Sequence, residues 1–262
     1  MPSVCLADGE LNYSLEGPTS GPTLMLSNSL GTDLGMWDSN TPIFTKHFRV
    51  LRYDTRGHGA STVSPGPYCI EQLGRDALAL LDALHIRRTH FCGLSMGGLI
   101  GQWMAVNAPE RIERLVLCNT AARIGTSDTW NSRINTVLAG GVQAMEDLRE
   151  ASIQRWFTPT YVERAPETVE VVVSMLARTD PLGYAANCAA VRDADFRAEL
   201  SRINATTLIV CGASDQVTTT EDGRFMQSHI VGAELAEFPA AHLSNVEMDD
   251  SFSLRVMDFL LK

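Results

Sequence analysis

Six short apolar segments recur along the chain with helix-length segments between them, and this alternation restricts the fold more than any other feature. Each segment is rich in Leu, Val, Ile or Cys and is nearly continuous in apolar character, as strands covered on both faces are. They occupy residues 23–28, 48–54, 89–95, 114–119, 206–212 and 234–238. The alternation predicts an α/β fold with a mostly parallel central sheet and helices on both faces.

The first residues follow a different pattern. Two runs of alternating polar and apolar residues, within residues 4–17, flank the dipeptide Asp8-Gly9. Asp-Gly favours the tight turn that joins two antiparallel strands. We therefore expect an antiparallel N-terminal hairpin beside the parallel strands. Apolar residues at helical spacing also predict helices over residues 70–85, 97–107 and 252–261.

Residues 122–190 lack a strand-like run, in contrast to the rest of the chain. Large side chains recur there at helical spacing, namely Trp130, Ile134, Leu138, Met145, Leu148, Trp156, Val171, Met175 and Tyr184. Open α/β sheets bind ligands at the carboxyl ends of their strands, so a helical block inserted after a strand end lies over that edge. We expect a helical cap at residues 122–190 on a core formed by residues 1–121 and 191–262.

Composition argues against several classes of partner. The 262 residues carry 31 acidic and 21 basic side chains, a net charge of −10, without a cluster of Lys or Arg. Nucleic acid and anionic lipid both require a positive face. Apolar runs stay shorter than the roughly 18 residues of a membrane span, and Asp8 and Glu10 are unlike a secretion signal. We expect a soluble, cytoplasmic protein that binds neither nucleic acid nor a membrane. The pattern does not define an oligomeric state.

Six cysteines are spread along the chain without metal-binding spacing or a C-x-x-C pair: Cys5, Cys69, Cys92, Cys118, Cys188 and Cys211. Three of them, Cys92, Cys118 and Cys211, lie within predicted strands, where a thiol packs as a small apolar group. We therefore expect free thiols and no metal site.

The segment Gly93-Leu94-Ser95-Met96-Gly97 matches the pattern G-x-S-x-G. A predicted strand precedes Ser95 and a predicted helix follows it, which is the context that this short pattern requires. So sharp a turn forces the serine into a strained conformation, and the two glycines let neighbouring backbone approach. The hydroxyl is held at a helix N-terminus, where developing negative charge is favoured. Ser95 is the predicted nucleophile.

A serine hydroxyl near neutral pH needs a base, and histidine suits this task because its usual pKa lies near neutrality. Five of the six histidines have another explanation. His85 and His229 lie near predicted helix C-termini, and His90 begins a predicted strand. His47 and His58 precede Ser95, an order that the motif does not use. His242 remains, in a loop after the last predicted strand. It is the predicted base.

The base in turn needs a carboxylate that fixes its tautomer and stabilises its charged form. Asp215 directly follows the strand at residues 206–212 and precedes His242 by 27 residues, which leaves room for one helix and one strand. The other place for an acid, after the preceding strand, holds Asn119-Thr120, which cannot ionise. The order Ser95, Asp215, His242 is the nucleophile-acid-base order that the motif predicts.

These segments resemble the α/β-hydrolase family over essentially the whole chain. Besides the serine motif, residues 53–61, with the sequence YDTRGHGAS, are similar to the family's D-x-R-G-x-G-x-S turn. The resemblance implies structural roles in this turn for Arg56 and His58.

The same resemblance places the oxyanion loop at residues 27–31. Alignment on Trp37 puts Asn28-Ser29 where most relatives carry His-Gly, a departure from the family pattern. The resemblance implies that the backbone amides of Leu30 and Met96 hold the oxyanion. Because backbone amides rather than side chains bind the oxyanion, we expect the chemistry to be retained with Asn28-Ser29 in place of His-Gly.

Two segments resemble one group of enzymes within this family more specifically. Residues 28–33 and 241–247 are similar to the corresponding segments of 3-oxoadipate enol-lactonases. The resemblance implies hydrolysis of 3-oxoadipate enol-lactone to 3-oxoadipate, a step in the β-ketoadipate pathway of aromatic catabolism. The reaction would pass through an acyl-enzyme and would require no metal or organic cofactor.

An anionic lactone substrate requires a cationic group in the cleft. Arg133, one helical turn from Trp130 in the predicted cap, is the first candidate, and Arg178 is the second. We expect Trp130 and Trp156 to line the pocket.

Other functions fit the same residues. A carboxylesterase, a perhydrolase or a carbon–carbon bond hydrolase of ring-fission products would use the same three side chains. A ligand sensor that retains a slow triad is a further alternative, although the sequence shows no appended domain that favours it. A haloalkane dehalogenase is disfavoured, because Ser95 stands where that enzyme has an aspartate.

Overall fold

The computed structural model describes residues 2–6 and 8–262. Its centre is an eight-stranded sheet in the order β1-β2-β4-β3-β5-β6-β7-β8. The strands are β1 Ser3–Leu6, β2 Gly9–Glu16, β3 Thr23–Ser27, β4 Arg49–Tyr53, β5 Thr89–Leu94, β6 Ile112–Cys118, β7 Thr206–Gly212 and β8 Glu234–Phe238. Pairings from β4 through β8 are parallel, and β1-β2 and β2-β4 are antiparallel. The predicted fold class is confirmed.

The N-terminal hairpin differs from its prediction by one position. Leu6 pairs with Gly9, so Gly9 belongs to the second strand rather than to the turn. Residue 7 lies outside the described residues. Cross-strand register sets the turn here, and the Asp-Gly signal in the sequence identifies the hairpin without fixing its register.

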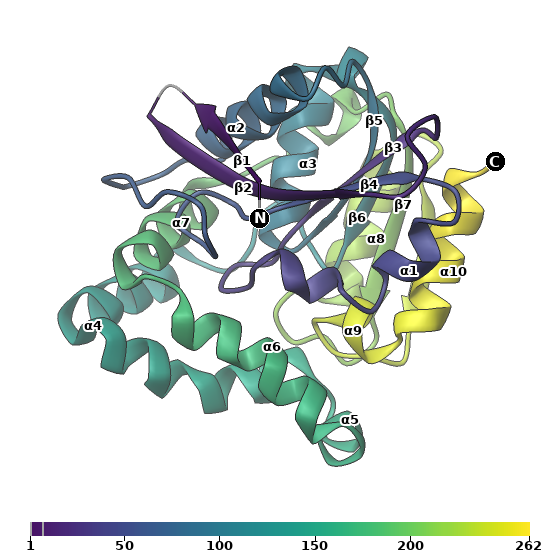
Figure 1. Ribbon diagram of the computed structural model, residues 1–262. Helices are drawn as coiled ribbons and strands as arrows, with labels where there is room; N and C mark the ends of the chain where they lie inside the picture. Colours follow the sequence, from purple (N-terminus) through teal and green to yellow (C-terminus); the bar gives the residue numbers. More distant parts are fainter. Residues whose placement is uncertain (1, 7) are drawn as a thin grey trace.

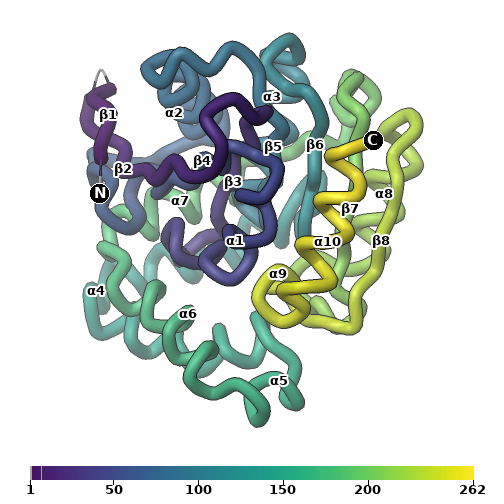
Figure 2. Tube along the Cα trace, turned by 45° about the vertical axis from the view of Figure 1, so that its right-hand side comes forward, coloured from purple at the N-terminus to yellow at the C-terminus, as the bar shows by residue number. Residues whose placement is uncertain are grey.

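Helices cover both faces of the sheet (Figures 1 and 2). Helices α1 (Thr41–Phe44) and α10 (Asp249–Leu260) pack together on one face, and α2 (Ile70–Ala83) and α3 (Met96–Asn107) pack together on the other. Helix α8 (Thr220–His229) packs against β7 and β8. The core lies between these layers, and every residue of β5 is buried. This explains the continuous apolar character of the strand segments.

Helix boundaries differ from the sequence prediction by one to three residues, and two of the differences have a local cause. Helix α2 ends at Ala83 because His85 adopts a left-handed backbone conformation, with φ of 56°. Helix α10 starts at Asp249, three residues before the predicted start. Asp249 and Asp250 in its first turn favour the helix dipole, although they are not part of the apolar pattern.

Four helices follow β6 and precede β7. They are α4 (Ser127–Trp156), α5 (Pro159–Arg164), α6 (Pro166–Arg178) and α7 (Pro181–Asp193). Proline opens three of them, where its missing N–H costs no helix hydrogen bond. Helix α4 is kinked at Gly141, whose φ is 56°, and it packs against α6 and α7. The four helices form a separate layer beyond one edge of the sheet (Figure 1).

Short elements complete the chain. They are α9 (Ser244–Glu247) and the 3₁₀ helices at Leu34–Trp37, Pro109–Arg111 and Leu200–Arg202. Within residues 2–6 and 8–262, all six cysteines are free, and Cys5 and Cys69 are exposed. The described helices include none that is long and apolar enough to cross a membrane.

Candidate active site

Ser95 lies at the turn between β5 and α3. Its backbone adopts φ of 57° and ψ of −112°, a conformation that L-residues avoid. Both flanking glycines are required by close backbone contacts. A Cβ on Gly93 would lie 2.2 Å from the Gly97 carbonyl oxygen, and one on Gly97 would lie 2.2 Å from the Ser27 carbonyl oxygen. The sequence pattern therefore corresponds to the strained turn that it predicts.

Asp215 and His242 meet at the same edge of the sheet. Asp215 follows β7, and His242 lies in the loop between β8 and α9. His242 Nδ1 lies 2.8 Å from Asp215 Oδ2, and both side chains are almost fully buried. With Nδ1–H donated to the carboxylate, Nε2 is the basic nitrogen of the neutral ring.

The surroundings of Asp215 keep its carboxylate ionised. Oδ1 accepts hydrogen bonds from the amides of Val217 and Thr218, and Oδ2 accepts one from the Thr218 hydroxyl. Burial opposes ionisation, but the charge and hydrogen bond of His242, with the Asn119 amide, outweigh it and lower the pKa of Asp215 to about 2. A permanent negative charge thus faces the imidazole.

Asn119 lies beside Asp215, although the sequence analysis mentions it only as a residue that cannot ionise. It directly follows β6 in a left-handed conformation, with φ of 42°. Its Nδ2 donates to Asp215 Oδ2 at 3.0 Å and to the Ala241 carbonyl at 3.1 Å, and its Oδ1 accepts from the Ser244 hydroxyl. Asn119 therefore links the acid to the loop that carries His242. A polar residue at the end of the strand next to the acid was the available signal.

Two backbone amides near Ser95 are free to bind an anion. The amides of Ser29, Gly31 and Gly97 donate to Met36 Sδ, to His58 Nε2 and to the Asn28 carbonyl, respectively. In the described part of the chain, the amides of Leu30 and Met96 have no acceptor. Met96 is also the first residue of α3, where the helix dipole favours negative charge.

Asn28 stabilises the loop of residues 27–31, which lacks the His-Gly of the common family pattern. Its Nδ2 donates to the Tyr53 carbonyl at 2.8 Å, and its Oδ1 accepts from Trp37 Nε1 at 2.9 Å. The side chain thus connects the end of β3 to β4 and to the 3₁₀ helix at Leu34–Trp37.

A pocket of about 130 Å³ lies between the sheet edge and the four-helix layer. The core contributes Ser95, His242, Leu30 and Ser29 to its lining. The helical layer contributes aromatic and cationic side chains, among them Trp130, Arg133, Arg155, Trp156 and Tyr184. The predicted serine and histidine therefore share one cavity with the predicted Arg133 and Trp130.

Two arginines line this pocket. Arg133 lies over the Trp130 ring, 5.3 Å from its centre, and its Nη1 is 3.5 Å from the Tyr184 hydroxyl. Arg155 Nη2 is 3.3 Å from the Ser152 hydroxyl. Burial, followed by the charge of Arg133, lowers the pKa of Arg155. Across the described residues, neither guanidinium forms an ion pair with a carboxylate.

Arg155 was not found from the sequence, and Arg178, the second candidate, lies outside this pocket. Arg178 is exposed and lies 3.4 Å from Asp33, outside the lining of the pocket. Helical spacing could not distinguish these residues, because which face of a cap helix meets the core depends on packing. Arg155 directly precedes Trp156, whose predicted place in the lining was the nearest sequence signal.

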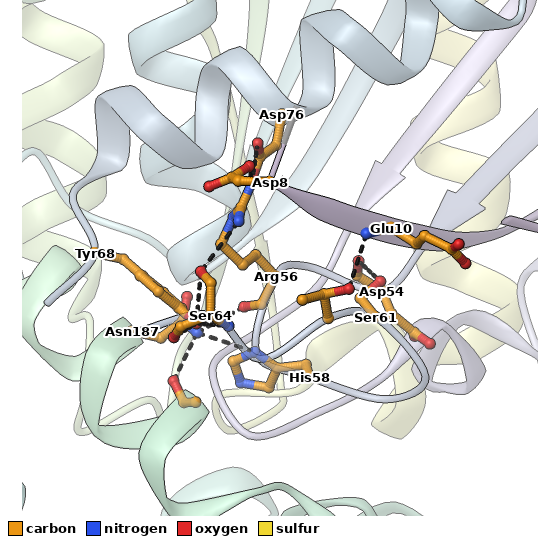
Figure 3. A network of polar contacts seen from close by, with 12 residues as sticks. Asp8, Glu10, Asp54, Arg56, His58, Ser61, Ser64, Tyr68, Asp76 and Asn187 are labelled. Carbon is orange, nitrogen blue, oxygen red and sulfur yellow. Dashed lines mark hydrogen bonds and ion pairs between the residues drawn. The ribbon is translucent and has the colours of Figure 1, made fainter. Parts of the chain in front are cut away.

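The turn at residues 53–61 is a dense polar network (Figure 3). Arg56 forms ion pairs with Asp76 and Asp8 at 2.7 and 2.8 Å. Asp54 Oδ2 accepts from the Asn12 side chain and the Ala60 amide. Arg56 is thereby held to α2 and to the N-terminal hairpin, in keeping with a structural role.

A doubly covered parallel sheet with a strained serine at a strand–helix turn and a histidine–aspartate pair at the same edge defines a class of hydrolytic enzymes. The chain belongs to the α/β-hydrolase family, because the family model described as "alpha/beta hydrolase fold" matches residues 22–249.

Named relatives are similar over almost their whole length. The chain is 45% identical to the "3-oxoadipate enol-lactonase 2" of Acinetobacter baylyi, across 94% of this chain and 91% of the relative. It is 40% identical to the "3-oxoadipate enol-lactonase 1" of the same organism, across 92% and 90%. The crystal structure of an enol-lactonase from Burkholderia xenovorans LB400 superposes with a TM-score of 0.97 at 44% identity and covers 100% of both chains.

Proposed function

We propose that this protein hydrolyses 3-oxoadipate enol-lactone to 3-oxoadipate, with Ser95, His242 and Asp215 as the catalytic side chains. The observation that carries the proposal is that Arg133 and Arg155, both without a carboxylate partner among the described residues, line the same pocket as Ser95 and His242. A pocket with two unpaired cations suits a small substrate that bears a carboxylate. The named enol-lactonase relatives support this choice.

Acylation begins when the Ser95 hydroxyl attacks the lactone carbonyl and its proton passes to His242 Nε2. Asp215 stabilises the resulting imidazolium. The amides of Leu30 and Met96 bind the oxyanion of the tetrahedral intermediate, at roughly 3 kcal/mol for each donor. Collapse of this intermediate breaks the ring bond to the enol oxygen, which takes the proton from His242. The enol remains attached, because it is part of the same acyl group.

Deacylation repeats the chemistry with water. Neutral His242 takes a proton from a water molecule, and the hydroxide attacks the acyl carbonyl in the same oxyanion hole. Collapse breaks the bond to Ser95 Oγ, which regains its proton from His242. The freed enol tautomerises to the ketone, so ring closure is disfavoured. Each step conserves atoms and protons without a metal or an organic cofactor.

The four helices α4 to α7 would act as a cap. We propose that residues 122–190 form this cap on a core of residues 1–121 and 191–262. Support comes from the pocket, because its aromatic and cationic lining residues come from α4 and α7 while the reacting groups come from the core. We also place the protein in the cytoplasm, where the free thiols of the described cysteines stay reduced.

A turnover panel tests the proposed function. Purified protein is assayed with the enol-lactone, with p-nitrophenyl acetate and with a ring-fission dienoate, in steady state and in single-turnover mode. We expect kcat/KM to be highest for the enol-lactone, with many turnovers per active site. Preference for either of the other substrates would instead support an esterase or a carbon–carbon bond hydrolase. A stall after one equivalent would support a ligand sensor.

Arginine variants test the observation on which the proposal rests. Removing either cation from the pocket, in Arg133→Ala or Arg155→Ala, should raise KM for the anionic lactone by about 10- to 100-fold, since a hydrogen bond to a charged group contributes roughly 1.5–3 kcal/mol. Turnover of neutral p-nitrophenyl acetate should change less than threefold. Arg178→Ala, a cap arginine outside the pocket, is the matched control. Unchanged KM in both pocket variants would contradict the assignment.

A further inference from the structure

His58 is a buried histidine outside the proposed triad. It lies between β4 and α2 in the turn of residues 53–61, beside Arg56 and Asn187 (Figure 3). Its Nε2 accepts a hydrogen bond from the Gly31 amide at 2.9 Å. Gly31 directly follows Leu30, whose own amide we assign to the oxyanion hole. The hydrogen bond of His58 is therefore made to the residue next to the proposed oxyanion donor.

The neighbours of the ring define its tautomer. Because Nε2 accepts a hydrogen bond, a neutral ring must carry its proton on Nδ1. Asn187 Nδ2 lies 3.4 Å from Nδ1, but it donates to the carbonyls of Arg56 and Gly183, each at 2.8 Å. Asn187 therefore has no hydrogen left for His58. The ring also forms a hydrogen bond with the Arg56 backbone, which a proton on Nδ1 can supply.

The ring is neutral under physiological conditions. Burial lowers the pKa of His58 to about 4, and the hydrogen bond to the Arg56 backbone opposes this only in part. The side chain is almost completely inaccessible to solvent. His58 thus presents a permanent lone pair to the Gly31 amide.

Both peptide groups around Leu30 are held by hydrogen bonds. The Ser29 carbonyl accepts from the Thr32 amide at 3.2 Å and from the Thr32 hydroxyl at 2.8 Å. In a trans peptide the C=O and N–H point in opposite directions, so holding this carbonyl helps to set the direction of the Leu30 amide. The next peptide, between Leu30 and Gly31, is held by His58.

Gly31 lies at a closely packed position that suits glycine. Its φ is 81°, and a Cβ there would lie 2.7 Å from Leu176 Cδ1 on helix α6. The loop is therefore enclosed between the turn of residues 53–61 and the helical layer. Among residues 2–6 and 8–262, the side-chain acceptor of the Gly31 amide is His58.

We propose that His58 is a positioning residue of the oxyanion hole, a neutral acceptor that holds the Leu30–Gly31 peptide so that the Leu30 amide stays aimed at the developing oxyanion. The inference rests on the proposed hydrolysis at Ser95. An apolar side chain at this position would leave the Gly31 amide buried without an acceptor, and the loop would rearrange to satisfy it. Because the oxyanion exists only along the reaction path, the loss should fall on kcat rather than on KM.

Kinetics of two His58 variants test the proposal. His58→Leu removes the acceptor, and His58→Gln retains a carbonyl oxygen that reaches the Gly31 amide. We expect kcat of His58→Leu to fall about 10- to 100-fold, less than or equal to the loss of a whole oxyanion donor, with KM within twofold. His58→Gln should recover most of this loss. A glutamine variant as slow as the leucine variant would overturn the acceptor role.

Ser61→Ala is the matched control within the same turn. The Ser61 hydroxyl donates to the Asp54 carbonyl at 2.7 Å and accepts from the Asn12 amide at 2.9 Å, and neither partner belongs to the oxyanion loop. Its loss should lower the melting temperature without lowering kcat. If kcat follows the melting temperature in both Ser61→Ala and His58→Leu, the role of His58 is structural and the proposal fails.

A tetrahedral adduct separates positioning from folding. Phenylboronic acid, which adds to the serine hydroxyl and places an oxygen in the oxyanion hole, should bind His58→Leu more weakly by the same factor as kcat falls. Adipate, a dicarboxylate whose carboxyl carbons are trigonal and that forms no tetrahedral adduct, should bind equally to both proteins. Equal boronate affinity would overturn the proposal. If the wild-type protein neither turns over the lactone nor binds the boronate, the proposed function fails instead, so the two failures are distinguishable.

Nitrogen NMR of the wild-type protein makes the test independent of whether His58→Leu folds. At pH 7 we expect the His58 ring to carry a proton on Nδ1 and none on Nε2, with the Gly31 amide proton shifted downfield by its hydrogen bond. A protonated Nε2 would contradict the proposal directly.

Discussion

At the residue scale, Asp215 keeps a charge inside the protein because donors surround both of its oxygens. His242 and Asn119 donate to Oδ2, and the amides of Val217 and Thr218 donate to Oδ1. Its pKa of about 2 means that the carboxylate remains ionised throughout the pH range in which histidine titrates. The group that steadies the imidazolium is therefore not the group that sets the acid limit of activity.

Replacing Asp215 with Asn should slow the reaction by about 10⁴-fold, as an amide in this position of a triad favours the wrong imidazole tautomer. The fold should persist, since the side chain keeps its size and part of its hydrogen bonding. Steady-state kcat and the melting temperature check both expectations. A kcat within tenfold of wild type would remove Asp215 from the triad.

Asn119→Ala tests the link between the acid and the His242 loop. The variant loses hydrogen bonds to Asp215 and Ala241 and leaves the Ser244 hydroxyl without its acceptor. We expect kcat to fall roughly tenfold and the free energy of unfolding to fall by about 1–3 kcal/mol. Asn204→Ala, at an exposed asparagine, is the control. Wild-type kcat in Asn119→Ala would show that the link has no catalytic consequence.

The sequence predicts some of these residues better than others. Ser95 stands in a pattern whose strand–helix context is local, so its backbone strain could be expected before the structure was known. Asp215 and His242 each follow a strand segment that is also locally visible. Arg155 and Asn119 act through contacts between segments far apart in the chain, and a single sequence carries little signal for such contacts.

At the element scale, Glu247 on α9 joins the His242 loop to the helical layer. Its Oε2 accepts from the Ala241 amide at 3.0 Å and from the Thr158 amide at 3.2 Å, and its Oε1 accepts from the Thr158 hydroxyl. Thr158 caps helix α5. Two further hydrogen bonds, from the Leu243 amide to the Trp156 carbonyl and from the Tyr161 hydroxyl to the Val246 carbonyl, connect the same elements.

Glu247→Gln should weaken this connection with little change in side-chain size. The new amide presents hydrogens to groups that themselves donate, so we expect the free energy of unfolding to fall by about 1–3 kcal/mol and kcat to fall with it. Urea denaturation and steady-state kinetics provide the measurements. Glu150→Gln, on the exposed side of α4, serves as the control. Equal stability of the two variants would show that Glu247 does not join the elements.

Element positions follow from the sequence more closely than element ends. The strands at Thr206–Gly212 and Glu234–Phe238 begin and end where their apolar segments do. By contrast, β6 begins at Ile112, two residues before the predicted segment, because Ile112 still pairs with Thr89 although the exposed Glu113 and a register shift follow it. Hydrogen bonding defines the strand, whereas burial defines the apolar pattern, so the two need not end together.

At the scale of the whole molecule, buried histidines should make stability sensitive to mild acid. The pKa of His58 is lowered to about 4 by burial, and burial likewise lowers the pKa of His90 to about 4. In the unfolded chain both rings have the usual pKa near 6.5. Between these values the unfolded state binds more protons than the folded state. The stabilisation is therefore complete above about pH 6.5 and decreases as the pH falls toward 4.

We predict that the free energy of unfolding, measured with urea between pH 7 and 5, decreases as the pH is lowered. Each neutral buried histidine should contribute a slope of up to about 1.4 kcal/mol per pH unit. His58→Gln should show a shallower slope than wild type, whatever its absolute stability. Parallel slopes in the two proteins would mean that His58 is already charged in the folded state.

The layered sheet and the position of the helical block follow from the alternation of segments, but the pocket does not. Its lining combines the oxyanion loop, the serine turn, the His242 loop and two helices from the four-helix layer. The layer meets the core through contacts such as Gly31 with Leu176 and Gly57 with Gly183, each between residues more than 100 positions apart. Periodicity within one helix does not encode such contacts.

Covalent labelling tests the central claim most directly. The protein is incubated with a fluorophosphonate, the modified residue is identified by peptide mass spectrometry, and the remaining enol-lactone turnover is measured in the same samples. The account predicts one equivalent of label on Ser95, loss of turnover in proportion to labelling, and no labelling in Ser95→Ala. Full turnover by a protein that is completely labelled at Ser95, or label on another residue with loss of activity, would contradict it.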